Sequence, residues 1–195
     1  DVKGIAKLAS DIVDKFYELP KEKRNRGVSV TVSSSCFVPK AFTPFQWSAQ
    51  NTCDEFLRKQ YLLKDSNERK QVKVNYHEPT VSSIEGILAR GDRKVAKLIV
   101  QAWQNGAKFD GWTESFKYDA WLKALEQTGL SREFYANRER SYDEILPWDH
   151  ISIGVSKRFF IEEMEKAKNE TVTPNCRQDC SMCGAKVFGG GVCFE

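Results

Sequence analysis

Four of the six cysteines of this 195-residue chain lie within its last twenty residues. Three, two and nine residues separate Cys176, Cys180, Cys183 and Cys193. Thiolates at such spacings can converge on one soft metal, and the glycines at 184 and 189–191 allow the chain to fold back towards the last cysteine. The pattern therefore predicts a tetrahedral zinc site or a four-cysteine iron–sulfur cluster. The alternative is a flexible tail of reduced or oxidised thiols.

A strand followed by a stiff aromatic loop is the second chemically informative feature. Residues 28–33 read Val-Ser-Val-Thr-Val-Ser, and this alternation predicts a half-buried strand. The loop at residues 36–47 reads Cys-Phe-Val-Pro-Lys-Ala-Phe-Thr-Pro-Phe-Gln-Trp, in which each proline restricts its own backbone and that of the preceding residue. Such a loop at a strand end is typical of a pocket wall. The alternative is a crossover that covers a sheet edge.

Several polar residues outside this loop are further candidates. His77 and Glu78 follow a second alternating segment, and a histidine beside a carboxylate can act as acid, base or ligand. The alternative is a polar strand terminus. Arg90 and Arg93 flank the expected start of a helix, where they could bind an anionic group, or they could form a salt-bridged turn. Trp112 and Trp148 stand beside acidic residues, either as core anchors or as parts of a substrate wall.

The elements that must position these residues follow from apolar spacing. Residues 5–16 carry a helical i, i+3, i+4, i+7 pattern, a second helix is expected from Cys53 to Tyr61, and residues 71–76 alternate as a strand. Helix, strand, helix and strand in this order predict an α/β fold with a parallel sheet over residues 1–80. Helical patterns then continue over residues 81–172, with a capping box at Ser82 and Glu85, before the cysteine-rich tail at 173–195.

Composition narrows the class of protein. The chain is 41% hydrophobic and 29% charged with a net charge of +3, which predicts a soluble globular protein and does not by itself imply nucleic acid. No apolar run is long enough to cross a membrane and no signal peptide opens the chain, so we expect a cytoplasmic protein with no membrane partner. Because the chain opens on Asp1 without a methionine, we expect it to be part of a longer protein.

Four separated motifs carry a resemblance to a known family. They are Phe-Val-Pro-Lys-Ala-Phe-Thr-Pro-Phe-Gln-Trp at 37–47, Ala-Arg-Gly-Asp-Arg at 89–93, Phe-Asp-Gly-Trp-Thr-Glu at 109–114 and Leu-Pro-Trp-Asp-His at 146–150. In this order they resemble the C-terminal part of radical SAM proteins in which a cobalamin-binding-like domain precedes the radical SAM domain. The resemblance covers nearly the whole chain. It departs from the family at Ala41, where a second proline is usual.

The resemblance implies a fold and a function. Residues 1–80 would be the C-terminal portion of an open (β/α) radical SAM barrel, in an oxidoreductase-like enzyme that uses S-adenosylmethionine and a [4Fe-4S] cluster. The three-cysteine cluster loop of such enzymes lies near the start of the barrel and is not in this chain, so the chain should be inactive without the N-terminal part of the same protein. The implied cofactor-contacting residues are Phe37, Val38 and Pro39, and the implied substrate-contacting residues are Lys40, Gln46, Trp47, His77, Arg90 and Arg93.

The cysteine tail does not supply that missing loop. Its first three cysteines share the spacing of the radical SAM motif, but they follow the last helix, so we interpret the tail as a structural or auxiliary site. A rival hypothesis is a metal-stapled interaction module without catalysis that contacts RNA through Arg90, Arg93 and the basic loop at 21–26. An enzyme segment would expose an apolar face where further barrel elements belong, whereas a self-contained module would not.

Overall fold

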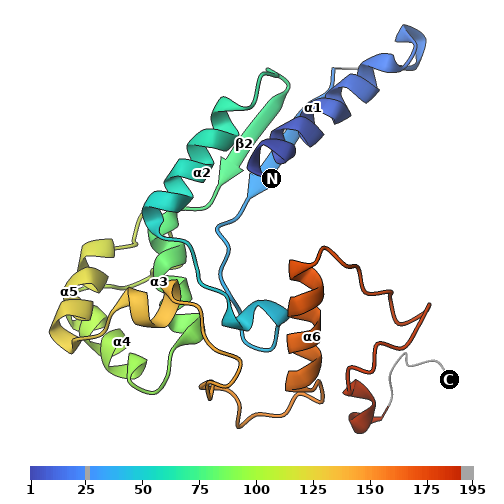
Figure 1. The fold of residues 1–195 in the computed structure, drawn as a ribbon. Coiled ribbons are helices and arrows are strands. Elements are labelled where there is room, and N and C mark those ends of the chain that lie inside the picture. The colour runs from blue at the N-terminus through green and yellow to red at the C-terminus, as the bar shows by residue number, and fades with distance from the viewer. Residues whose placement is uncertain (25–26, 190–195) are drawn as a thin grey trace.

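The computed structural model describes residues 1–24 and 27–189, so Cys193 and two residues of the basic loop lie outside the described part. The fold is mixed α/β. In the described residues, six helices of ten or more residues and two strands follow one another as Figure 1 shows. They are α1 (Val2–Glu18), β1 (Val30–Ser34), α2 (Cys53–Asp65), β2 (Val72–Tyr76), α3 (Pro79–Arg90), α4 (Val95–Gln104), α5 (Tyr118–Thr128) and α6 (Lys157–Lys168). None of the helices in the described residues is long and apolar enough to cross a membrane.

The two strands form a parallel sheet with the crossover helix α2 between them in sequence. The register runs from Val30 opposite Val72 to Ser34 opposite Tyr76. The two faces of this sheet differ. One face is formed by valines that pack with α1, whereas the other carries exposed polar side chains in register, Thr31 opposite Lys73 and Ser33 opposite Asn75. Within the described residues, each strand has a strand neighbour on one edge only.

Helix α1 covers the valine face with its small residues. Ala9 and Val13 pack against Val72 in the smallest of three hydrophobic clusters. Two larger residues of the predicted apolar stripe, Leu8 and Ile12, are 63% and 47% exposed. The sequence pattern predicted the helix, but it did not predict which side of the stripe is buried. Small side chains let the helix approach the sheet closely, and this places the larger ones at the margin of a narrow sheet.

Helices α3, α4 and α5 enclose the main core. Its buried members include Ile87 and Leu98, both fully inaccessible, together with Trp121 of α5. Helix α3 begins one turn earlier than the predicted capping box, because Pro79 occupies its first turn, where a missing N–H costs nothing. Ser82 is therefore inside the helix and buried, and the capping-box prediction was wrong.

A third cluster joins the aromatic loop to the end of the chain. Trp47 lies in the 3₁₀ turn η2 (Pro44–Trp47). It packs with Phe160 of α6 and with Leu146 and Trp148 of the segment before that helix. Figure 1 shows this turn beside α6, although more than a hundred residues separate them in sequence. The loop is therefore held by residues of the helical extension as well as by the sheet from which it emerges.

Candidate functional site

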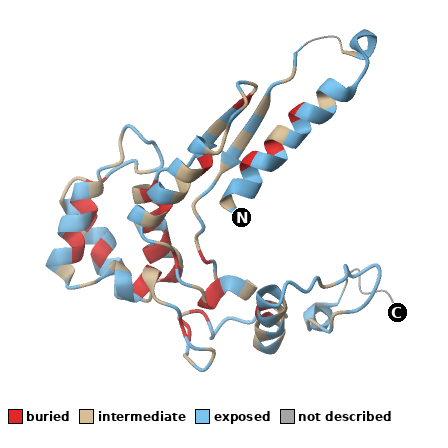
Figure 2. Cartoon of the chain, turned by 45° about the horizontal axis from the view of Figure 1, so that its top comes forward, coloured by how far each residue is buried: buried red, intermediate tan, exposed pale blue. Residues whose placement is uncertain are grey.

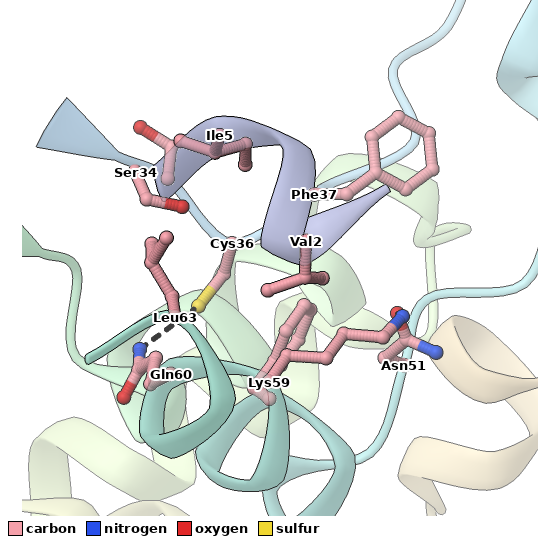
Figure 3. A pocket seen from close by; sticks show the side chains of 11 residues that line it. Val2, Ile5, Ser34, Cys36, Phe37, Asn51, Lys59, Gln60 and Leu63 are labelled. Carbon is pink, nitrogen blue, oxygen red and sulfur yellow. Dashed lines mark hydrogen bonds between the residues drawn. The ribbon is translucent and has the colours of Figure 1, made fainter. Parts of the chain in front are cut away.

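A small pocket lies at the carboxyl end of β1, between that strand end and helices α1 and α2 (Figure 3). This is the edge of a parallel sheet at which α/β proteins bind ligands. The pocket has a volume of about 190 Å³. Its lining combines apolar side chains with a few polar ones: Val2, Ile5, Ser34, Ser35, Cys36, Phe37, Asn51, Phe56, Lys59, Gln60 and Leu63.

Helix α2 contributes four of these residues from a single face. Phe56, Lys59, Gln60 and Leu63 follow the i, i+3, i+4, i+7 spacing that brings side chains together on a helix. Thr52 caps the start of this helix, and its hydroxyl accepts a hydrogen bond from the backbone N–H of Glu55 at 3.3 Å. The helix was predicted from the apolar spacing of Cys53, Phe56, Leu57 and Tyr61. Of these, Phe56 is buried and lines the pocket, whereas Leu57 and Tyr61 are 40% and 62% exposed. The sequence analysis did not identify Lys59 and Gln60 as pocket residues, although their helical spacing from Phe56 and Leu63 can be read from the sequence.

The polar floor of the pocket is organised around one backbone carbonyl. The amide nitrogen of Gln60 donates to the carbonyl oxygen of His77 at 2.8 Å, and the Cys36 thiol lies 3.8 Å from the same oxygen. Gln60 also approaches the Cys36 sulfur at 3.9 Å, as Figure 3 shows. Burial raises the pKa of the Cys36 thiol, so this sulfur is protonated at neutral pH and is a weak donor, not a nucleophile.

The loop residues predicted to contact a cofactor occupy three different environments. Phe37 lines the pocket and meets Phe45 edge to face, with ring centroids 5.8 Å apart. Val38 is half-buried and Pro39 is buried. Figure 3 shows the Phe37 side chain at the rim of the pocket, with its ring directed away from Val2 of α1. Of the three predicted residues, Phe37 is the one that lines the pocket.

Gln50 fixes this loop to helix α3, a role that the sequence did not indicate. Its side-chain amide donates to the carbonyl oxygens of Phe37 at 3.2 Å and Ser82 at 2.8 Å. The side chain lies directly over Gly86, where an added Cβ would come within 2.2 Å of its oxygen. Only a glycine leaves room for Gln50 at this point of α3.

The residues predicted to contact substrate are divided between surface and core. Lys40 forms an exposed ion pair with Glu85, and His77 is exposed at the end of β2. Gln46 and Trp47 are buried: the Gln46 oxygen accepts a hydrogen bond from the Trp148 indole at 2.7 Å, and Trp47 packs edge to face on Tyr142. These two residues therefore position the loop from beneath. Trp148 is also a core residue, whereas Trp112 is 65% exposed.

Arg90 and Arg93 do not form a pair. Arg93 is exposed, but Arg90 is fully buried at the end of α3 and donates to the carbonyl oxygens of Ser48 and Ala136, both at 2.8 Å, and of Arg138 at 3.2 Å. The predicted salt-bridged turn is absent among the described residues, because backbone carbonyls take the place of a carboxylate. Arg90 thereby ties the loop after η2 to the segment after α5.

The cysteine-rich tail lies against the start of α6, and its described cysteines do not form a metal site. Cys176 and Cys180 are exposed, Cys183 is half-buried, and all three are free thiols. The Cys183 carbonyl accepts a hydrogen bond from the backbone N–H of Ser156 at 3.0 Å, at the start of α6. Within residues 1–24 and 27–189, no group of three or more histidine, cysteine or carboxylate side chains is arranged to hold a metal ion. The fourth predicted ligand, Cys193, lies outside these residues.

No family model, no curated protein and no solved structure matches this chain. The pocket geometry is therefore the main guide to chemistry. Ligand sites usually enclose about 300–1,000 Å³, so a pocket of about 190 Å³ is too small to enclose a nucleoside-sized molecule. The arrangement is suited to form one wall of a larger site.

Proposed function

We propose that this chain is the C-terminal part of a cytoplasmic radical SAM-type enzyme, in which it forms a wall of the cofactor and substrate pocket and is inactive alone. The observation that carries the proposal is the two-faced parallel sheet. Its valine face packs on helix α1, and its other face presents Thr31, Ser33, Lys73 and Asn75. In a (β/α) barrel the helices cover the outer face of the sheet, and the active site lies at the carboxyl ends of the strands. In this proposal the uncovered polar face is turned to the interior of an open barrel, and the carboxyl ends of β1 and β2 contribute to the site.

Two further observations support an incomplete sheet. Each strand has one edge without a strand neighbour in the described residues, and such edges are normally paired or protected. Helix α1 exposes Ile5, Leu8 and Ile12 as a stripe beside the sheet. The rival hypothesis of a self-contained, RNA-contacting module does not require such a stripe. We infer that the N-terminal part of the same protein completes the sheet and covers α1.

In this proposal the site residues have distinct roles. Phe37 supplies an apolar surface at the rim for S-adenosylmethionine, with Val38 and Pro39 behind it, while Lys40 and His77 are the exposed groups available to substrate. When bound to a [4Fe-4S] cluster on the N-terminal part, S-adenosylmethionine would supply the radical chemistry. This chain's own part is to shape the pocket and to exclude water.

The test is the affinity of the full-length protein for S-adenosylmethionine. We expect Phe37→Ala to weaken binding about tenfold, because it removes an apolar contact of about 1–2 kcal/mol. Phe45→Ala is the matched control, since Phe45 lies in the same loop and is equally exposed, at 43%, but does not line the pocket. Equilibrium binding under anaerobic conditions gives both values. An unchanged affinity in Phe37→Ala, with lower stability, would place Phe37 in the framework and count against the proposal.

We also propose that Cys176, Cys180, Cys183 and Cys193 bind one zinc ion or one iron–sulfur cluster, as an auxiliary site. The chemistry of the donor set supports this, because the described three are free thiols on a segment with few buried apolar side chains. Metal binding would then supply the free energy that gathers these sulfurs.

Elemental analysis of anaerobically purified protein should give about one zinc, or about four irons with matching sulfide, per chain. Cys180→Ser should remove the metal and leave the helical extension folded, whereas the control Cys53→Ser should retain it. Metal-free protein with an ordered tail, or two disulfides among these cysteines, is the result that excludes the site.

A further inference from the structure

Three arginines surround a second pocket, on the helical extension. Arg90 ends α3, and Arg138 and Arg140 follow the π-helical turn η3 (Glu133–Asn137). The pocket has a volume of about 420 Å³, and Glu144 and His150 also line it. It does not share a lining residue with the pocket at the strand end.

The Arg140 side chain is buried, and two of its three nitrogens lack a hydrogen-bond acceptor among the described residues. Its side chain is 2% exposed, and one of its terminal nitrogens, Nη2, donates to the carbonyl oxygen of Arg90 at 2.8 Å. Its Nε and Nη1 have no hydrogen-bond acceptor among the described residues, and neither has the Nε of Arg90. A buried cationic N–H without an acceptor costs several times what an ordinary hydrogen bond contributes. These three donors therefore indicate that an acceptor is missing.

The charges around the pocket do not balance. Glu144 binds Arg138 through both oxygens, at 2.6 and 2.7 Å, and lies 4.0 Å from the Arg140 Nε. Asp92 also lines the pocket, where it accepts hydrogen bonds from the Tyr135 hydroxyl at 3.0 Å and from the backbone N–H of Lys94 at 2.9 Å. Three guanidinium groups against two carboxylates leave one positive charge in excess.

The electrostatics agree with this count. The pKa of Arg90 is lowered to about 10, chiefly by burial and then by the positive charges of Arg140 and Arg138. Burial also lowers the pKa of Arg140. Both groups remain cationic at neutral pH. The cluster therefore holds its charge at a cost that an anion would relieve.

We propose that this pocket binds the oxyanion group of a small molecule, a carboxylate or a phosphate, which takes the place of the Glu144 carboxylate beside Arg138 and Arg140. The guanidinium fork matches two oxygens of either group. Glu144 is the built-in counter-ion at this position, and its carboxylate is the one that an incoming oxyanion must displace. The proposal is independent of the radical SAM assignment.

The test is a titration of the 195-residue chain with sodium phosphate and with sodium acetate, at constant ionic strength maintained with chloride. The NMR signals of the buried Arg90 and Arg140 Nε–H groups report binding at this pocket. We expect Glu144→Gln to bind the preferred anion about tenfold more tightly, because the competing carboxylate is gone, and Arg140→Lys to bind it about tenfold more weakly, because the fork is lost.

Glu55→Gln is the matched control, since Glu55 forms a comparable ion pair with Arg58 on the surface of α2. It should leave the titration unchanged. A response to phosphate but not acetate identifies a phosphate-bearing ligand, and the reverse identifies a carboxylate. If neither anion shifts the two signals, or if Glu144→Gln and Arg140→Lys, both folded by their NMR spectra, bind as the wild type does, the proposal is overturned.

Discussion

The helical segment at 79–137 and the α/β segment at 1–76 bury their apolar side chains to very different extents. Among the residues that the structure describes, helices α3 to α5 and the turn that follows them share one cluster of twelve buried residues, whereas the cluster of the α/β segment contains three: Ala9, Val13 and Val72. Figure 2 shows the difference directly, because buried residues are concentrated in α3 to α5 and form only a narrow stripe on α1.

The comparison separates helical amphipathicity from burial. Helix α1 and helix α4 both carry a clear apolar stripe in the sequence. On α4 the buried part of the stripe includes Leu98, which is fully inaccessible against α5, while on α1 it consists of alanines and one valine and leaves Leu8 63% exposed. Both stripes have exposed members, such as Trp103 on α4, but in the helical segment a large side chain reaches the centre of the core. We therefore expect the helical segment to fold on its own contacts, whereas the proposed function assigns a further covering surface to the α/β segment.

The largest effect should come from removing a core side chain of the helical segment. Leu98→Ala should lower the free energy of unfolding by about 2–5 kcal/mol, because it leaves a cavity that three helices cannot close. The same substitution at Leu8 should cost less than about 0.5 kcal/mol, because that side chain is already exposed. Chemical denaturation monitored by circular dichroism gives both values. Equal costs at the two positions would remove the distinction between the segments.

A smaller effect should follow from disconnecting the aromatic loop from α3. Gln50→Ala should cost about 1–3 kcal/mol, because it removes the two hydrogen bonds by which the buried Gln50 side chain joins the carbonyl oxygens of Phe37 and Ser82. Lys40→Ala is the control, because Lys40 links the same loop to the same helix through an exposed ion pair with Glu85. This substitution should lower the free energy of unfolding by less than about 1 kcal/mol. Faster hydrogen exchange across the loop in Gln50→Ala only is the expected signature.

The alkaline stability of the helical segment should depend on Tyr135. Burial, followed by the hydrogen bond to Asp92, raises the pKa of this phenol to about 12. Because the folded state then favours the protonated form, the contribution of this group is complete below about pH 10, the unfolded value, and is lost as the pH rises through 12. Tyr135→Phe should therefore cost about 0.5–1.5 kcal/mol at pH 7 and progressively less above pH 10.

Unfolding measurements between pH 7 and 12 check this dependence, with Tyr61→Phe as the control, because Tyr61 is 62% exposed. A cost of Tyr135→Phe that stays constant over this range would show that the phenol does not titrate differently in the folded protein.

The smallest effect on stability should come from a substitution on the exposed stripe of α1 that prevents the chain from associating with itself. We expect the chain alone to self-associate through the exposed stripe of α1, because an uncovered apolar surface favours association. Leu8→Lys should abolish this self-association and change the free energy of unfolding by less than about 0.5 kcal/mol. Sedimentation velocity over a range of concentrations measures this, and Val172→Lys, at an 88% exposed position of the tail, should leave self-association unchanged. A wild-type chain that is monomeric at high concentration and melts at high temperature would favour the self-contained module.

Local patterns were enough to predict most of the secondary structure. The alternation at 28–33 and 71–76 became β1 and β2, and the helical spacing at 5–16 became part of α1. The parallel pairing also followed from the sequence, because a helix between two strands restricts how they can be joined. These predictions succeeded because alternation and helical spacing are properties of neighbouring residues.

Only the tertiary structure decided which faces are buried and which polar groups meet. Gln50 and Gly86 are 36 residues apart, and Arg90 and Arg140 are 50 apart, so no local pattern relates either pair. Trp47 belongs to an aromatic loop in the sequence and to a core cluster in the fold, because α6 returns to cover it. The amino-acid sequence by itself determined the elements and the chemical types available. Long-range packing determined the environment of each side chain, and with it the pocket at the strand end and the arginine cluster.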